Sequence, residues 1–159
     1  YMHRKTDAEL AEVYQPILRE HGIEVSDEVA GKAAGIMKER AQLTTDLWDL
    51  TSYFFIAPTQ YEEKQTRKYW KGDNPAILRE LRGVLEGIDD FSKENTERIV
   101  HAWIEEKGYG MGQVMNTLRL ALVGAGKGPG MYDVTSFIGK EETLRRIDNL
   151  LTNLKPAIE

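Results

Sequence analysis

A single charged residue stands in the nineteen-residue stretch from Gly108 to Gly126, which leads into a turn rich in glycine and proline. That residue is Arg119, and its neighbours Leu118 and Leu120 are apolar. Burying a guanidinium without a partner costs several kcal/mol, so Arg119 needs a counter-charge or a polar ligand. It is therefore the first candidate for chemistry, as a donor to an anion or to the polar edge of a nucleobase.

The turn from Gly124 to Gly130 fits neither common phosphate-binding motif. The dinucleotide fingerprint would need glycine where Pro129 stands, and the phosphate-binding loop of nucleotide hydrolases would need serine or threonine at Gly128. Both motifs also follow a strand, whereas the segment before this turn has helical character. The sequence therefore argues against a nucleotide phosphate loop.

Other residue types that carry chemistry form no catalytic pattern. The three histidines, His3, His21 and His101, are far apart in the sequence and make no metal-ligand pair on one helix turn. The chain has no cysteine, which excludes disulfides, thiol catalysis and the usual structural zinc sites. Acidic pairs such as Glu62-Glu63 lie in helical, charged settings that are typical of a solvated surface. We predict no catalytic residue and no metal site in this chain.

The composition is that of an ordinary globular protein, with 159 residues, 41% hydrophobic and 30% charged. The net charge of −5 argues against binding nucleic acid through an overall positive field, so any such contact must be local. Residues 1–57 hold 6 basic and 10 acidic side chains, and residues 58–159 hold 15 and 16. The second part is the better candidate for contact with a polyanion. No signal-peptide pattern or membrane-spanning stretch is evident, and we expect a cytoplasmic location.

Helical periodicity covers almost the whole chain, and no convincing alternating strand is present. We predict an all-α fold, a helical bundle or cage of about eight to nine helices in two subdomains, residues 1–57 and 58–159. The boundary is placed at Ala57-Pro58. The aromatic residues are expected to pack in helical cores rather than stack on bases. Capping and turn signals predict helices that begin near Thr6, Ser26, Thr45, Glu62, Asp73 and Ser92, then the Arg119 helix, and two helices separated by a break at Gly139.

Several segments, taken in order and spacing, strongly resemble the C-terminal end of bacterial glutamyl-tRNA synthetases. They are Gln113 to Gly124, Gly128 to Tyr132, Phe137 to Glu142 and Leu144 to Ile147. Upstream, similar matches cover essentially the rest of the chain, at Lys38 to Ala41, the Phe54-Phe55 pair and Tyr61. The resemblance implies a helical anticodon-binding cage that is joined to a class I catalytic core.

That catalytic core is absent from this sequence. Neither the histidine-glycine signature nor the lysine-serine signature of class I synthetases occurs, and the chain begins at Tyr1, which we interpret as a piece of a longer protein. The resemblance implies that ATP and Mg²⁺ belong to the parent enzyme and that this piece needs no cofactor and is inactive alone. It implies tRNA(Glu) and the catalytic domain of the same polypeptide as partners, and neither a membrane nor DNA.

The resemblance also implies roles for individual residues. The family's counterparts of Arg119 and of Gly128, Pro129 and Met131 approach the anticodon bases, and the counterpart of Arg40 is associated with the third base. The sequence departs from its relatives by carrying Gly128 and Met131 where a hydroxyl residue and a leucine are common. Only the backbone of residue 128 can therefore serve as a contact.

Alternatives remain for several residues and for the function. The candidate phosphate contacts are Lys127, Lys140, Arg145 and Arg146, although Arg145 and Arg146 equally fit the surface of the last helix. Arg119 can instead form an internal ion pair with a carboxylate such as Asp133 or Glu142, and Arg40 can be a solvated helix residue. The alternative functions are the anticodon domain of a class I lysyl-tRNA synthetase and a helical protein-interaction module.

Overall fold

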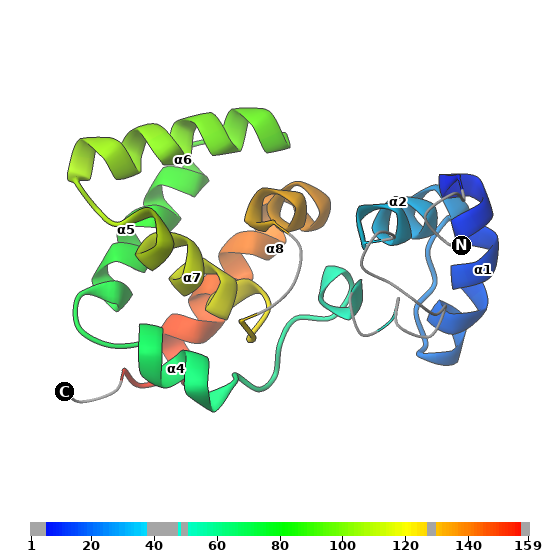
Figure 1. Ribbon diagram of the computed structural model, residues 1–159, viewed down its shortest axis with the longest axis horizontal. Coiled ribbons are helices and arrows are strands. Elements are labelled where there is room, and N and C mark those ends of the chain that lie inside the picture. The colour runs from blue at the N-terminus through cyan, green and yellow to red at the C-terminus, as the bar shows by residue number, and fades with distance from the viewer. Residues whose placement is uncertain (1–5, 38–47, 49–50, 127–129, 157–159) are drawn as a thin grey trace. The chain divides into compact units, whose positions relative to one another are not determined.

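The computed structural model describes residues 6–37, 48, 51–126 and 130–156 (Figure 1). Every regular element in these ranges is helical, which confirms the predicted all-α fold. The described ranges contain seven α-helices and one 3-10 turn, below the predicted eight to nine helices. The helix predicted to begin at Thr45 lies mostly outside the described residues. The chain divides into two compact units, Tyr1–Ile56 and Ala57–Glu159.

Two helices, α1 (Asp7–Glu20) and α2 (Asp27–Met37), pack against each other in the first unit. A capping box begins α1, because the Thr6 hydroxyl accepts from the backbone of Glu9 and the Glu9 side chain accepts from the backbone of Thr6. The Gln15 amide donates to the carbonyl of Val25 at 2.8 Å and to Asp27 at 3.0 Å, which ties α1 to the start of α2.

The 3-10 turn η2 (Ser52–Phe54) completes the described part of this unit. The hydroxyls of Tyr14 and Thr51 are hydrogen-bonded, and the ring of His21 stacks on that of Trp48 at 3.9 Å between centroids. Burial raises the pKa of Tyr14 to about 12, against a smaller opposite effect of the hydrogen bond from Thr51. Tyr14 is therefore a neutral structural residue at physiological pH.

Five helices form the second unit: α4 (Glu63–Tyr69), α5 (Asn74–Glu86), α6 (Lys93–Lys107), α7 (Met111–Leu122) and α8 (Met131–Asn153). Pro75 lies in the first turn of α5. A backbone N–H in the first turn has no acceptor within the helix, so the absence of this group in proline removes no helical hydrogen bond. The Ser92 side chain accepts from the backbone N–H of Asn95 and begins α6, and Gly108 ends it in a left-handed conformation. Sequence signals therefore located most helix boundaries in this unit.

Helices α5 to α8 enclose one apolar core. Helix α8 contacts α5, α6 and α7, and α4 packs against α7. The fully or almost fully buried core residues include Leu78, Leu81, Leu85, Val100, Ile104, Leu118, Leu122, Ile147 and Leu150. Phe54 in the first unit and Trp103 here are also buried, as predicted for aromatic core residues.

The backbone of α8 breaks at Gly139, which has φ 87° and ψ 167° inside an otherwise helical run. The structure therefore confirms the predicted break, although the two segments follow each other without a loop. Asp148 lies in the segment after the break, where Nε and Nη2 of Arg82 donate to its two carboxylate oxygens at 2.6 and 3.0 Å. This paired interaction fixes the second segment of α8 against α5.

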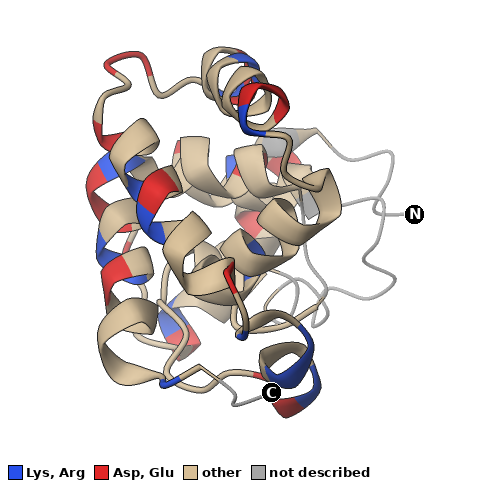
Figure 2. Cartoon of the chain, turned by 90° about the vertical axis from the view of Figure 1, so that its left-hand side faces the viewer, with Lys and Arg blue, Asp and Glu red and all other residues tan. Residues whose placement is uncertain are grey.

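Charged residues of both signs alternate over the ribbon of residues 57–159 (Figure 2). This mixture agrees with the nearly balanced charge of this part of the sequence. Recognition of a polyanion would therefore depend on particular helices rather than on the field of the whole unit.

Candidate functional site

The end of α7 leads directly into the glycine-rich turn. The backbone N–H of Val123 donates to the carbonyl of Arg119 at 2.8 Å, and that of Gly124 donates to the carbonyl of Leu120 at 3.0 Å. Gly124 has φ 78°, so the chain leaves the helix through the left-handed region that glycine accepts readily. Residues 127–129 lie outside the described part, and α8 begins at Met131.

The first half of this turn is packed against the segment 58–65. The backbone N–H of Glu62 donates to the carbonyl of Gly124 at 2.7 Å, and the N–H of Gly126 donates to the Glu62 carboxylate at 3.3 Å. A Cβ atom on Gly124 would lie 2.7 Å from the carbonyl oxygen of Gln60, and one on Gly126 would lie 2.6 Å from the side chain of Gln65. These two glycines therefore allow close packing between residues 124–126 and the segment 58–65.

Arg119 lies in the last turn of α7 and is half-buried. It also takes part in polar or electrostatic contacts of the protein. Met111 and Met115 precede it at helical spacing on the same side of α7, and Met111 is 40% exposed. The partly exposed side of α7 therefore carries two methionines, polar residues such as Asn116, and Arg119 at the end nearest the turn.

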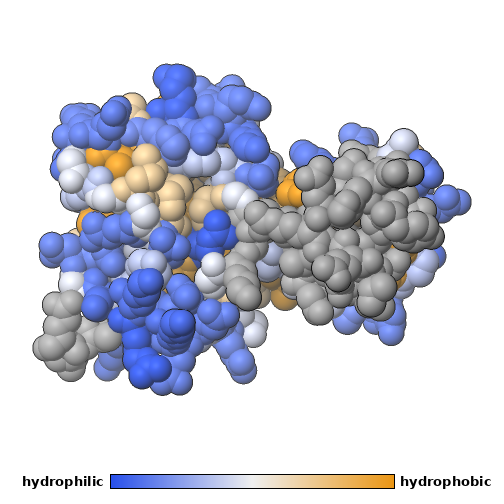
Figure 3. Space-filling model, viewed as in Figure 1, coloured by the Kyte–Doolittle hydropathy of each residue, from blue (hydrophilic) through white to orange (hydrophobic). Residues whose placement is uncertain are grey.

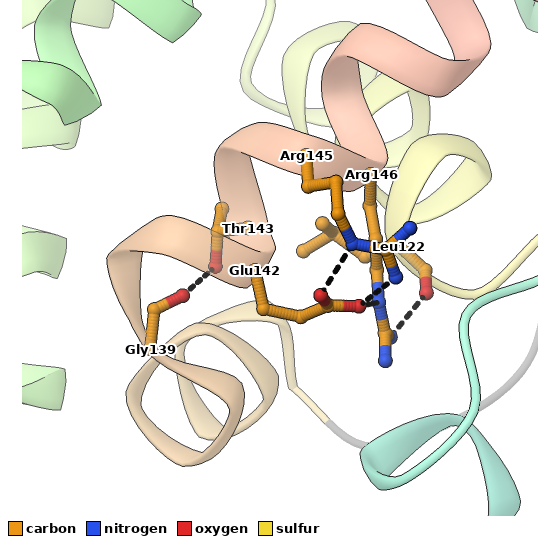
Figure 4. A network of polar contacts seen from close by, with 6 residues as sticks. All are labelled: Leu122, Gly139, Glu142, Thr143, Arg145 and Arg146. Carbon is orange, nitrogen blue, oxygen red and sulfur yellow. Dashed lines mark hydrogen bonds and ion pairs between the residues drawn. The ribbon is translucent and has the colours of Figure 1, made fainter.

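The two carboxylates proposed as internal partners of Arg119 bind other cations. Asp133 forms an ion pair with Lys93 at 2.9 Å, from the start of α6. Glu142 binds Arg145 and Arg146, each at 2.7 Å (Figure 4). Asp133 thus joins α8 to α6, and Glu142 forms ion pairs within α8.

The fully buried arginine of the described ranges is Arg146, with 1% of its surface exposed. Its Nε donates to Glu142 at 2.7 Å, and its Nη1 donates to the carbonyl of Leu122 at 2.9 Å (Figure 4). Leu122 is the last residue of α7, and its carbonyl has no partner within the helix. Arg146 therefore satisfies the end of α7 and places a positive charge where the helix dipole favours one.

The sequence prediction for Arg146, a phosphate contact or a helix-surface residue, is wrong, because both roles need an exposed side chain and Arg146 is buried. A signal was available in the spacing, since residues 143, 146, 147 and 150 are all buried and share one face of α8. Arg146 also lies four residues after Glu142, which is the spacing of an intrahelical ion pair.

Hydrogen bonds from Arg145 and then Arg146 hold the pKa of the Glu142 carboxyl below its ordinary value of 4.5, although partial burial acts in the opposite direction. The same environment acts on Arg146, where burial lowers the pKa of the guanidinium and Glu142 opposes that effect. Glu142 is thus an ionised carboxylate at neutral pH that compensates the buried guanidinium.

Of the remaining predicted site residues, Lys140 and Met131 are described by the structure, and the others are not. The ammonium of Lys140 donates to the carbonyls of Glu86 at 3.0 Å and Ile88 at 2.8 Å, so it stabilises the end of α5. The Met131 side chain is 4% exposed and packs in the core, which leaves its backbone at the start of α8 as the part nearest the turn. The predictions that fall outside the described residues are those for Arg40, Lys127, Gly128 and Pro129.

Within the described ranges, no cluster of three or more His, Asp or Glu side chains is suitably placed to hold a metal ion. A search of the same ranges found no helix that is long and apolar enough to cross a membrane.

Comparison with known proteins gives consistent matches over nearly the whole chain. A sequence model of the family described as "Anticodon binding domain" matches residues 9–151. The glutamate–tRNA ligase of Phocaeicola vulgatus is 49% identical over 155 residues, which cover 98% of this chain and 31% of that protein. The glutamate–tRNA ligase of Flavobacterium johnsoniae is 44% identical over 154 residues, covering 97% and 30%. The chain thus spans about a third of the length of these curated relatives.

Solved structures show the same similarity. A crystal structure of a glutamate tRNA ligase from Elizabethkingia meningosepticum, in complex with its amino acid, matches with a TM-score of 0.91 and 38% identity, over 98% of this chain and 31% of that one. The glutamate-tRNA synthetase of Elizabethkingia anophelis matches with a TM-score of 0.84 and 37% identity, over 95% and 29%.

Replacing Gly124 by alanine should destabilise the second unit more than replacing Gly108. Both glycines have positive φ, 78° and 73°, but a Cβ at Gly108 meets nothing within 4 Å. Gly108→Ala should cost about 1 to 2 kcal/mol for the left-handed conformation. Gly124→Ala adds the clash with Gln60 and Pro58, about 1 to 3 kcal/mol more. Urea unfolding measures both, and equal losses would show that the turn does not pack as described.

Arg146 and Arg145 form a matched pair for testing the buried contact. Arg146→Ala should lower the free energy of unfolding by about 3 to 5 kcal/mol, because it removes a fully buried side chain, leaves the Leu122 carbonyl without its donor, and leaves Glu142 with Arg145 alone. Arg145 is 54% exposed, and its replacement by alanine should cost at most about 1 kcal/mol. Thermal and urea unfolding of the two variants compare these losses. Similar small losses would contradict the role assigned to Arg146.

The lowered pKa of Glu142 predicts a specific pH dependence of stability. A carboxyl with a lower pKa in the folded state stabilises the fold above its unfolded pKa, and this contribution is lost as pH falls through the folded value. Glu142→Gln should therefore be less stable than the wild type at pH 7, and the difference should shrink below about pH 5. Glu141→Gln, at the exposed neighbouring position, is the control. A difference that stays constant from pH 7 to pH 3 would contradict the assignment.

Proposed function

Because the chain belongs to the anticodon-binding domain family, we propose that it is the anticodon-recognition region of a glutamate–tRNA ligase, which positions tRNA(Glu) for glutamylation by a separate catalytic domain. The observation that carries this proposal is the match of 98% of the chain to one third of a glutamate–tRNA ligase. The names of the curated relatives also support glutamate over the lysyl alternative.

The geometry of the turn is compatible with reading unpaired bases. Anticodon bases that are splayed out expose their hydrogen-bonding edges, and a guanidinium offers paired donors in a rigid plane. Arg119 stands at the end of α7, a few residues before a turn whose first half is fixed by packing. We propose that Arg119 donates to an anticodon base and that the backbone of Gly128, Pro129 and Met131 approaches the neighbouring base.

Arg40 is proposed to read the third anticodon base, in line with the family resemblance of its segment. Lys127 remains a proposed phosphate contact. Lys140 and Arg145 could contact phosphates only in competition with their bonds to the end of α5 and to Glu142. They are therefore weaker proposals than the sequence alone indicated.

The reaction itself belongs to the rest of the parent enzyme in this proposal. ATP and Mg²⁺ would be held by the catalytic domain, because this chain lacks both signature motifs of a class I core. The task of this region is binding and orientation in the cytoplasm. Correct placement of the anticodon sets the position of the acceptor end of the tRNA.

Replacing Arg119 by alanine should weaken binding of an RNA stem–loop that carries the glutamate anticodon. The loss should be about 1 to 3 kcal/mol, or roughly five- to 150-fold in affinity, which is the range for a guanidinium that reads a base. Fluorescence anisotropy with the 159-residue chain measures it. Arg98→Ala is the control, because Arg98 is exposed on α6 and its guanidinium donates to the nearby Asn95 at 2.6 Å. Equal affinity of the Arg119→Ala variant and the wild type would exclude base reading by Arg119.

A further inference from the structure

A short basic helix lies beside the turn in this otherwise acidic chain. The segment from Tyr61 to Gly72 contains four cationic side chains, Lys64, Arg67, Lys68 and Lys71, and two acidic ones, Glu62 and Glu63. Lys64, Arg67 and Lys68 are exposed on α4. Figure 2 shows the short helix beside the C-terminal marker as mostly blue. This local excess of positive charge contrasts with the net charge of −5 of the whole chain.

The structure connects this helix to the turn through hydrogen bonds. Glu62, the residue before α4, donates its backbone N–H to Gly124 and accepts from Gly126 through its carboxylate. These bonds join the start of α4 to the first half of the turn. A strand of RNA that reaches residues 124–126 would therefore have the cations of α4 nearby.

The other end of α4 is anchored to the residues that follow α8. Trp70 is 1% exposed, and its indole N–H donates to the carbonyl of Leu154 at 2.7 Å. The next residue, Lys155, is exposed and adds a cation near this end of α4. We call Lys64, Arg67, Lys68, Lys71 and Lys155 the α4 basic surface.

The two acidic neighbours, Glu62 and Glu63, offset two of the five positive charges of this surface. The Glu62 carboxylate is hydrogen-bonded to the turn. Glu63 pairs with Arg67 at 3.5 Å, and these side chains are 82% and 70% exposed, so the pair is weak and readily replaced. Figure 3 shows that the part of residues 57–159 where α4 lies is hydrophilic, in contrast to the apolar patch farther up the same unit.

A groove of about 570 Å³ runs beside α4 and is open to solvent. Its lining includes Tyr61, Leu154 and the exposed ion pair of Arg67 with Glu63, so it combines apolar walls with a cation whose pairing is readily exchanged. Such a groove gives a strand of RNA room to lie close to the helix, with its phosphates toward the cations and its apolar sugar faces toward the walls.

We propose that the α4 basic surface binds the phosphodiester backbone of the RNA whose anticodon bases reach the turn. This inference rests on the proposed function and adds the surface that holds the strand in register. Contacts with phosphates position a nucleic acid without reading its sequence, whereas contacts with bases provide the specificity. In this arrangement α4 supplies affinity and Arg119 supplies discrimination.

The test compares two double variants of the 159-residue chain that lose the same charge. Lys64→Ala with Lys68→Ala removes two cations of the α4 basic surface, and Arg79→Ala with Arg98→Ala removes two exposed cations from α5 and α6. Affinity for the glutamate anticodon stem–loop is measured between 50 and 200 mM salt, on the order of the range in which phosphate contacts are evident. Circular dichroism verifies the folding of each variant.

The α4 variant should bind about tenfold more weakly at low salt. The slope of log affinity against log salt concentration should become less steep by about 1.4 to 1.8, the value for two lost phosphate contacts. The loss should be the same for an RNA with an altered anticodon, since backbone contacts carry no sequence information. Lys64→Arg with Lys68→Arg should restore both affinity and slope.

The outcomes separate this inference from the proposed function. If the wild type binds the stem–loop and the α4 variant matches the Arg79/Arg98 control in affinity and slope, the α4 basic surface does not contact RNA and the proposed function stands. If the wild type does not bind the stem–loop at low salt, both are overturned.

Discussion

The buried guanidinium of Arg146 is the interaction on which the second unit depends. It joins two elements, because it reaches from α8 to the last carbonyl of α7 and is neutralised by Glu142 on its own helix. A buried charge is tolerated only when its hydrogen bonds are satisfied in good geometry, so the pair restricts how α7 and α8 can sit against each other. The end of α7, and with it the position of Arg119, follows from that restriction.

A second restraint acts on the residues that follow α7, and it comes from a segment earlier in the chain. The segment 58–65 packs closely on residues 124–126: a Cβ at Gly124 would lie against the backbone oxygen of Gln60, and one at Gly126 against the side chain of Gln65. Hydrogen bonds of Glu62 with Gly124 and Gly126 hold the same residues in place. Arg146 thus has a structural role at the end of α7, and a different residue, Arg119, is proposed to bind RNA.

The sequence was sufficient for the fold class and for most helix boundaries, because Thr6, Ser92, Pro75 and Gly108 are strong local signals. It was insufficient for the site, since burial depends on which helix faces meet. Arg119 stands among apolar neighbours yet is half-buried, whereas Arg146 stands in a charged run yet is fully buried. The role of Lys140 at the end of α5 was equally hidden, as it joins residues more than fifty positions apart. Tertiary packing decided each of these cases.

The most direct test of the account is the response of the Arg119 side chain itself to RNA. In a nitrogen-15 correlation spectrum of the 159-residue chain, we predict that the Nε–H signal of Arg119 shifts when a stem–loop with the glutamate anticodon is added. The shift should be much smaller at the same saturation with a stem–loop whose anticodon is replaced. An unchanged Arg119 signal at saturation with the glutamate stem–loop, or the same shift with both RNAs, would contradict the claim that this residue reads an anticodon base.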